Sequence, residues 1–180
     1  GGVATLDVAR RVIFTSGADD TDITATIAGT NASGLPISET LTGASGAAAQ
    51  SALDFKTVTS VIPSAAVATT VIIGTNGVAS SPWVRFDDYG AHAEVAIQAT
   101  VTGTVNFTVQ QTLQDSDPAS PVDKVAPDDI VWVNHPDSAL AAATATAQGN
   151  YAYPPIFAKV TLNSGTGSVS TVFRQVFTGH

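Results

Sequence analysis

Apolar and polar side chains alternate along most of this chain, in segments rich in valine, isoleucine, threonine and phenylalanine. Because successive side chains of a β-strand point to opposite faces, this period of two predicts strands with one covered face. Glycine, asparagine, aspartate and serine separate the segments, as they do at turns. The expected strands are Arg11–Thr15, Asp22–Gly29, Leu35–Thr42, Asp54–Ile62, Thr69–Gly74, Trp83–Asp87, Ala93–Thr102, Val105–Leu113, Ile130–Asn134, Ile156–Asn163 and Ser168–Phe177.

This pattern predicts an all-β protein made of two small antiparallel β-sandwich or barrel-like domains in tandem. Strands rich in threonine are typical of antiparallel sheets with one solvated face. A break over Thr75–Pro82 separates an N-terminal domain, residues 1–76, from a C-terminal domain, residues 77–180, and each is long enough for a small β-domain. Within the first domain, Gly1–Val8 is expected to form a flexible arm that reaches a neighbouring molecule.

Three turns are expected to close β-hairpins, at Gly29–Gly34, Thr102–Thr104 and Asn163–Gly167. Each contains glycine, which tolerates the positive φ angles that tight hairpin turns require. The last two hairpins resemble each other in sequence.

Three further segments do not show the strand pattern. Gly43–Ser51 is expected to be a short helix or an ordered loop. Ala139–Gly149 is rich in alanine but lacks a wide apolar stripe, so it predicts at most a marginal helix. Asp115–Asp129 contains three prolines and five aspartates and is expected to be a long exposed loop.

Composition narrows the possible partners. Seven basic residues against fifteen acidic ones give a net charge of -8, which argues against binding nucleic acid, because that binding depends on neutralising phosphates. The chain has no cysteine, which excludes disulfides, thiolate metal sites and a cysteine nucleophile. The most apolar stretch, Val61–Gly74, is shorter than a bilayer requires, and the first residues lack the apolar centre of a secretory signal. We therefore expect neither nucleic acid nor membrane as a partner.

Candidate catalytic residues are few. The histidines are His92, His135 and His180, and no serine lies in a G-x-S-x-G setting. His135 belongs to a turn-forming sequence, Asn134-His135-Pro136-Asp137, where a structural or solvent-exposed histidine is the simpler interpretation. We expect no catalytic residue and no enzymatic activity.

Metal and phosphate sites are equally weakly indicated. Asp19–Asp22 and Asp87–Asp88 offer carboxylates to calcium, and His92 lies near the second pair, but the first cluster lacks the spacing of a calcium-binding loop. Aspartates that cap turns explain both clusters without an ion. Gly165–Gly167 has no following helix and no lysine to hold a phosphate. We expect no metal or cofactor.

Aromatic side chains and strand edges point instead to binding. Trp83 and Trp132 lie in apolar strand contexts that favour the core, whereas Tyr151–Tyr153 is expected to be an exposed patch for a protein or a sugar. Lysine and glutamate, which normally protect strand edges from association, are scarce, so some edges are expected to serve assembly.

Several segments resemble a widespread group of structural proteins from the virions of tailed bacteriophages. The resemblance spans nearly the whole chain, although the Asp115–Asp129 loop is longer than in that group. The segments that carry it are Ala9–Ser16, Ile23–Thr30, Glu39–Gly43, Phe55–Val61, Gly103–Gln110, Gly149–Pro154 and Asn163–Val169.

The resemblance implies a virion component without enzymatic activity. The first expectation is a head decoration (cement) protein that bridges subunits of the major capsid protein, with Arg10 and Arg11 pairing with capsid acids. The second is a component of the tail or neck. Assembly in a reducing host cytoplasm fits the absence of cysteine, and a homo-oligomer, trimer or dimer, is natural for capsid accessories.

Two other functions remain open from the residues alone. One is a carbohydrate- or receptor-binding β-sandwich module with Tyr151–Tyr153 as its platform. The other is a hydrolase, for which His135 is the best candidate base.

Overall fold

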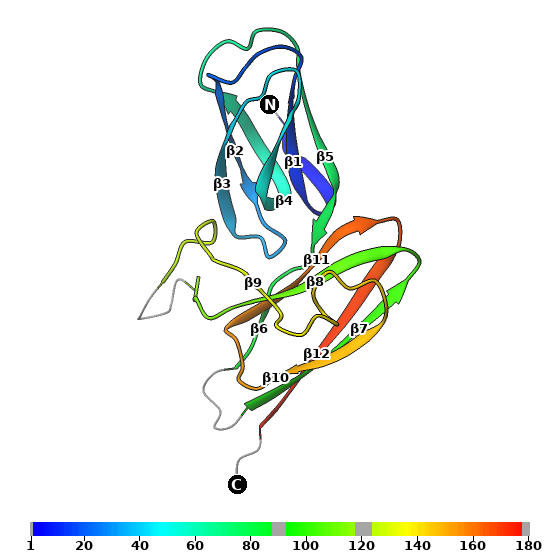
Figure 1. Ribbon diagram of the computed structural model, residues 1–180. Coiled ribbons are helices and arrows are strands. Elements are labelled where there is room, and N and C mark those ends of the chain that lie inside the picture. Colours follow the sequence, from blue (N-terminus) through cyan, green and yellow to red (C-terminus); the bar gives the residue numbers. More distant parts are fainter. Residues whose placement is uncertain (1, 88–92, 118–123, 178–180) are drawn as a thin grey trace. The chain divides into compact units, whose positions relative to one another are not determined.

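The computed structural model describes residues 2–87, 93–117 and 124–177, and in these ranges the chain forms strands and connecting segments without a helix. The all-β prediction is therefore confirmed. The chain divides into two compact units, Gly1–Ser80 and Ser81–His180 (Figure 1). The division lies after Ser80, four residues beyond the boundary expected after residue 76, because strand β5 (Val71–Ser80) continues through the expected break.

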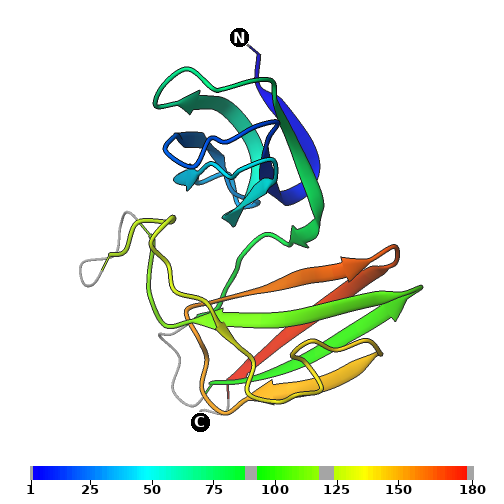
Figure 2. The ribbon, with the colours of Figure 1, turned by 45° about the horizontal axis from the view of Figure 1, so that its top comes forward.

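The first unit is a single curved antiparallel sheet with strand order β3-β2-β4-β1-β5 (Figures 1 and 2). Its inner face carries a core of alternating apolar side chains centred on Phe14, Ile27 and Phe55. The strands are β1 (Ala4–Ser16), β2 (Thr24–Thr30), β3 (Pro36–Thr42), β4 (Ala48–Pro63) and β5 (Val71–Ser80).

Strand β4 begins earlier than the sequence pattern indicated. Residues Ala48, Ala49 and Gln50 pair with Thr15, Phe14 and Ile13 of β1, so the expectation of a helix or loop at Gly43–Ser51 is wrong for its second half. Alanine gives no clear period-two signal, and pairing with β1 decides the conformation.

Strand β5 continues to Ser80, through residues that the sequence predicts to be a break between domains, because it contains a bulge. Arg10 pairs with Ala79 and Val12 with Thr75, so three residues of β5 stand opposite one residue of β1. The Asn76 side chain accepts a hydrogen bond from the backbone N–H of Val78 at 3.0 Å, which stabilises the bulge. The expected break over Thr75–Pro82 is therefore wrong up to Ser80.

The second unit is a β-sandwich of two antiparallel sheets, β6-β11-β8-β9 and β10-β7-β12 (Figure 2). Its core lies between them and includes Ile97 from one sheet and Phe107 and Val160 from the other. The strands are β6 (Val84–Arg85), β7 (Ala93–Thr102), β8 (Val105–Thr112), β9 (Val133–Asn134), β10 (Ala147–Tyr151), β11 (Phe157–Gly165) and β12 (Ser168–Phe177).

The expected marginal helix at Ala139–Gly149 is absent from this described segment. Leu140 is fully buried in the core, and Ala143 exchanges backbone hydrogen bonds with Phe107 at 2.8 Å. Ala147–Tyr151 then forms β10 against β7. An extended chain buries this segment better than an isolated helix, which has no wide apolar stripe to pack.

Two of the three expected hairpins are crossovers between sheets. Strands β7 and β8 belong to different sheets, as do β11 and β12, so each turn carries the chain from one layer of the sandwich to the other. The two turns lie side by side, and the N–H groups of Thr166 and Gly167 both donate to the carbonyl oxygen of Thr104. Only the turn between β2 and β3, of these three, closes a hairpin within one sheet.

Candidate functional site

An aromatic cluster lies on the four-stranded sheet of the second unit. The ring centroid of Trp83 is 5.1 Å from that of Trp132 and 5.7 Å from that of Phe157. Trp83 precedes β6, Trp132 precedes β9 and Phe157 opens β11, so strand pairing brings these distant segments together. Both tryptophans are half-buried rather than enclosed in the core, which leaves part of each indole at the surface.

Two cations lie over these rings. The Lys159 Nζ atom is 4.7 Å from the Trp132 ring centroid, and the Arg85 guanidinium carbon is 5.4 Å from that of Phe157. Arg85 also donates to both carboxylate oxygens of Asp115, at 2.9 and 3.0 Å. Phe157 and Lys159 are themselves buried, so the cluster leaves at the surface parts of the two indole rings and the Arg85 side chain.

The loop expected at Asp115–Asp129 is tied down at its base. Val125 donates a backbone hydrogen bond to Asp115 at 2.8 Å, and Ser116 is buried. Residues 118–123, in the middle of the loop, lie outside the described residues. The expectation of an exposed loop is thus wrong for Ser116, because the Arg85–Asp115 ion pair and the Val125 hydrogen bond fold the base of the loop against the sheet.

The expected aromatic patch at Tyr151–Tyr153 does not form. Tyr153 is 53 % exposed, but Tyr151 is only 4 % exposed, since it ends β10 on the face that packs into the core. The Tyr151 ring lies 4.9 Å from that of His135 and 6.3 Å from that of Phe86. Burial, with a smaller contribution from Tyr153, raises the pKa of Tyr151 well above its ordinary value of 10.0.

His135 has a structural role in the second unit. It is buried, its backbone N–H donates to Val109, and its Nδ1 accepts a hydrogen bond from the backbone N–H of Asp137 at 3.1 Å. The Nδ1 lone pair is therefore already used within the turn. His92 and His180, the other histidines considered for chemistry, lie outside the described residues.

The acidic cluster at Asp19–Asp22 serves a turn. Asp19 accepts hydrogen bonds from the backbone N–H of Thr21 at 3.2 Å and from the Thr21 hydroxyl at 2.8 Å. Asp20 is buried and accepts one from the backbone N–H of Ala68 at 2.8 Å. No group of three or more aspartate, glutamate or histidine residues that could hold a metal is found in the described ranges. Of the second acidic pair, Asp88 lies outside them.

The segment expected to be a free arm is attached to the first unit from Ala4 onward. Ala4 and Thr5 pair with β4, and the Lys56 Nζ atom donates to the carbonyl oxygens of Leu6 and Asp7 at 2.7 and 2.9 Å. Lys56 thus supports a wide bulge in β1, and the expectation of a flexible arm is wrong for Ala4–Val8.

The two arginines expected to reach capsid acids are paired within the chain. Arg10 donates to both Asp7 carboxylate oxygens, at 2.8 and 2.7 Å, and these hydrogen bonds hold the pKa of Asp7 well below its ordinary range. Arg11 lies 3.6 Å from the buried carboxylate of Asp54. Both arginines therefore contact carboxylates of their own chain, and their expected contact with capsid acids stays a prediction.

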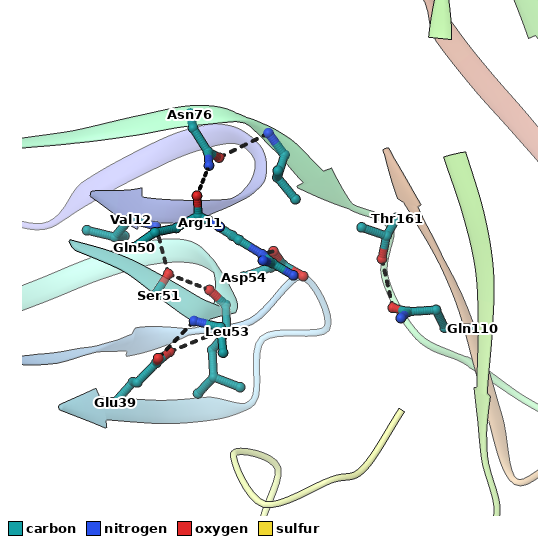
Figure 3. Close-up of polar contacts among 12 residues, drawn as sticks. Arg11, Val12, Glu39, Gln50, Ser51, Leu53, Asp54, Asn76, Gln110 and Thr161 are labelled. Carbon is teal, nitrogen blue, oxygen red and sulfur yellow. Dashed lines mark hydrogen bonds and ion pairs between the residues drawn. The ribbon is translucent and has the colours of Figure 1, made fainter. Parts of the chain in front are cut away.

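A polar network fixes the bulge of β4 opposite β1 (Figure 3). The Ser51 hydroxyl accepts from the backbone N–H of Val12 and donates to the carbonyl oxygen of Leu53, both at 2.8 Å. The Glu39 carboxylate, on β3, accepts from the N–H groups of Ala52 and Leu53 at 2.8 and 2.9 Å. These contacts satisfy the backbone groups that the bulge removes from the sheet.

Large apolar side chains are exposed on both units. In the first unit Ile62 and Ile72 are 62 % and 65 % exposed, and in the second Leu113 and Val131 are 65 % and 62 % exposed. Among the residues that the structure describes, the exposed large apolar side chains are Val3, Val8, Ile62, Ile72, Ile73, Val84, Leu113, Val131, Val133, Tyr153, Val172, Val176 and Phe177. Where such side chains gather into a contiguous patch they mark contact sites, whereas scattered ones are normal on any protein surface.

Comparisons with family models, with curated proteins and with solved structures returned no match to this chain. No helix that could cross a membrane occurs in the ranges described above.

Proposed function

We propose that this chain is a structural protein of a tailed-bacteriophage virion, a head decoration protein that stabilises the capsid by bridging subunits of the major capsid protein. The observation that carries the proposal is the exposure of large apolar side chains on both β-units of a chain with only 12 % charged residues. The sequence resemblance described above supports the same assignment.

Two units on one chain suit a bridging role. Each has its own core and its own exposed apolar side chains, exemplified by Ile72 in the first and Val131 in the second. One chain can thus contact two neighbouring subunits, and each stable contact requires on the order of 1,000 Å² of buried surface. The protein acts by burying area across a joint that internal DNA pressure tends to open.

Two polar residues that the sequence offered as metal-binding or catalytic candidates also support a structural role. Asp19 caps a turn, and the Nδ1 atom of His135 accepts a backbone hydrogen bond. These hydrogen bonds stabilise turns of the chain itself, as expected for side chains with a structural role.

Heat resistance of purified particles tests the proposal. Particles stripped of the protein, or produced without it, should release their DNA at a lower temperature or a lower chelator concentration than complete particles, and adding the purified chain back should restore resistance. Unchanged resistance would contradict a head decoration role and favour the tail or neck.

The aromatic cluster favours a second candidate, a carbohydrate- or receptor-binding module. Trp83 and Trp132 supply partly exposed aromatic rings, which combine apolar surface with an N–H donor and suit contact with a ligand. Binding to a glycan array that is lost in Trp132→Ala but kept in Tyr153→Ala would support it. A silent array would count against it.

A further inference from the structure

Strand β12 (Ser168–Phe177) ends the three-stranded sheet of the second unit and is shown in red in Figure 2. Its pairing with β7 runs through ten consecutive residue pairs, from Ser168 opposite Thr102 to Phe177 opposite Ala93, without a register shift. In the described part of the second unit, β7 is its one strand partner. The other edge of β12 therefore presents backbone N–H and C=O groups along most of a strand about 34 Å long.

The other terminal strands of the two units carry features that prevent edge-to-edge pairing. β3 begins at a proline, β5 is interrupted by the Asn76–Val78 bulge, β10 has five residues, and β6 and β9 have two each. Short length, bulges and proline are the devices by which natural sheets protect their edges. β12 has none of them, contains no lysine, and consists mainly of β-branched and aromatic residues.

The composition of the sheet indicates what kind of chain can pair there. The chain carries a net charge of -8, yet β7, β10 and β12 together contain one acid, Glu94, and one base, Arg174. Electrostatic repulsion between two copies is therefore weaker when they approach through this sheet than through the acidic remainder of their surfaces.

We propose that a second copy of this chain pairs antiparallel with the edge of β12, around a two-fold axis near Thr171. The pairing covers Ser168–Arg174, because Gln175 is already engaged: its side chain exchanges hydrogen bonds with the backbone of Asp87 at 3.0 and 2.6 Å. The two three-stranded sheets then form one continuous six-stranded sheet.

The side chains of Ser168–Arg174 are compatible with pairing between two copies. With the axis at Thr171, Val172 lies opposite Ser170 of the second copy, and Arg174 lies opposite Ser168 of the second copy. Small polar side chains thus face the larger ones, and the single charge does not face its equivalent, which would be destabilising. Val172, 61 % exposed in the single chain, loses much of that exposure.

Sedimentation velocity tests the proposal with a matched pair of variants. The unmodified chain should shift from monomer to dimer as its concentration rises. Ser170→Lys combined with Val172→Lys places lysines opposite each other across the two-fold axis and should abolish the dimer. Thr100→Lys combined with Gln98→Lys places the same charges on the neighbouring positions of the central strand β7 and should leave the dimer intact. A chain that stays monomeric at every concentration, or a β12 double variant that dimerises as strongly as the β7 double variant, overturns the proposal.

Disulfide capture tests the register independently, since the chain has no cysteine of its own. A mixture of Ser170→Cys and Val172→Cys chains should form a cross-linked dimer under mild oxidation, much faster than Gln98→Cys chains do. Equal rates would contradict the two-fold arrangement. This dimer is independent of the virion assignment: a dimer that fails to bind particles would count against the proposed function alone.

Discussion

Gly167 lies so close to Thr102 that a Cβ atom on residue 167 would stand 2.2 Å from the Thr102 carbonyl oxygen. This contact belongs to the end of the sandwich where two crossovers lie side by side, and the backbone of one turn occupies the space that a side chain of the other would need. Glycine is thus required there by packing of backbone against backbone.

Gly167→Ala should consequently lower the free energy of unfolding by on the order of 3 kcal/mol, since backbone atoms must shift to admit the methyl group. Gly74→Ala is the matched control: a Cβ at that position meets nothing within 4 Å, and the change should stay within about 1 kcal/mol. Urea unfolding of both variants measures the difference. Equal effects would show that the crossover contact is not tight.

Tyr151 should make the protein sensitive to alkali. Burial raises its pKa in the folded state, so above pH 10 the unfolded chain loses the phenolic proton first and unfolding becomes more favourable as the pH rises. Tyr151→Phe should flatten the fall in stability above pH 10, while Tyr153→Phe, at an exposed position, should not. Thermal denaturation across the alkaline range checks this; identical profiles for the two variants would refute it.

Glu39 should matter more than an ordinary strand glutamate, because its carboxylate accepts two backbone hydrogen bonds from the bulge of β4. Glu39→Ala should cost about 2 kcal/mol, and Glu39→Gln roughly half as much, since the amide keeps one acceptor oxygen. Glu94→Ala, at an exposed position on β7, should change stability by less than about 0.5 kcal/mol. Denaturant unfolding compares the three variants, and a loss no larger than that of Glu94→Ala would contradict the bulge-pinning role.

Asp7 should remain ionised below the ordinary carboxyl pKa of 3.8, because Arg10 hydrogen-bonds its charged form. The stabilisation from this pair is complete above that ordinary value and is lost as the pH falls toward the lowered pKa. NMR titration of the Asp7 carboxyl carbon measures the shift directly. In Arg10→Gln the pKa should return toward 3.8, and a titration unchanged by this substitution would exclude the ion pair as its cause.

Much of the fold follows from local sequence. The alternation of apolar and polar residues marks β2, β3, β7 and β12 to within a few residues, because one face of each is more buried than the other and the period of two is visible. The more deeply buried β8 and β11 are marked instead by β-branched residues between glycine-containing turns. Two of the strand segments that the sequence did not predict, the start of β4 at Ala48 and β10 at Ala147, contain alanines, which have little preference between helix and strand when tertiary pairing decides. The first residues of β1 and the end of β5 were also not predicted, because bulges interrupt the alternation there.

Non-local features could not be predicted. A turn such as Thr102-Gly103-Thr104 has the same residues whether it joins neighbours in one sheet or crosses between two, so the hairpin and the crossover are indistinguishable from sequence. Tyr151 was expected at the surface because the strand that turns it inward was not recognised. The Trp83–Trp132 contact joins segments about fifty positions apart through β11 and β8, and no local signal indicates it.

The number of copies of this chain in each virion tests the central claim, that it contributes contact area to a particle, most directly. Quantitative mass spectrometry of purified phage particles, calibrated on the major capsid protein, measures it. A head decoration protein should be present in hundreds of copies, in a fixed ratio to the capsid subunits that matches the symmetry of the shell. Absence of the chain from purified particles would contradict the account.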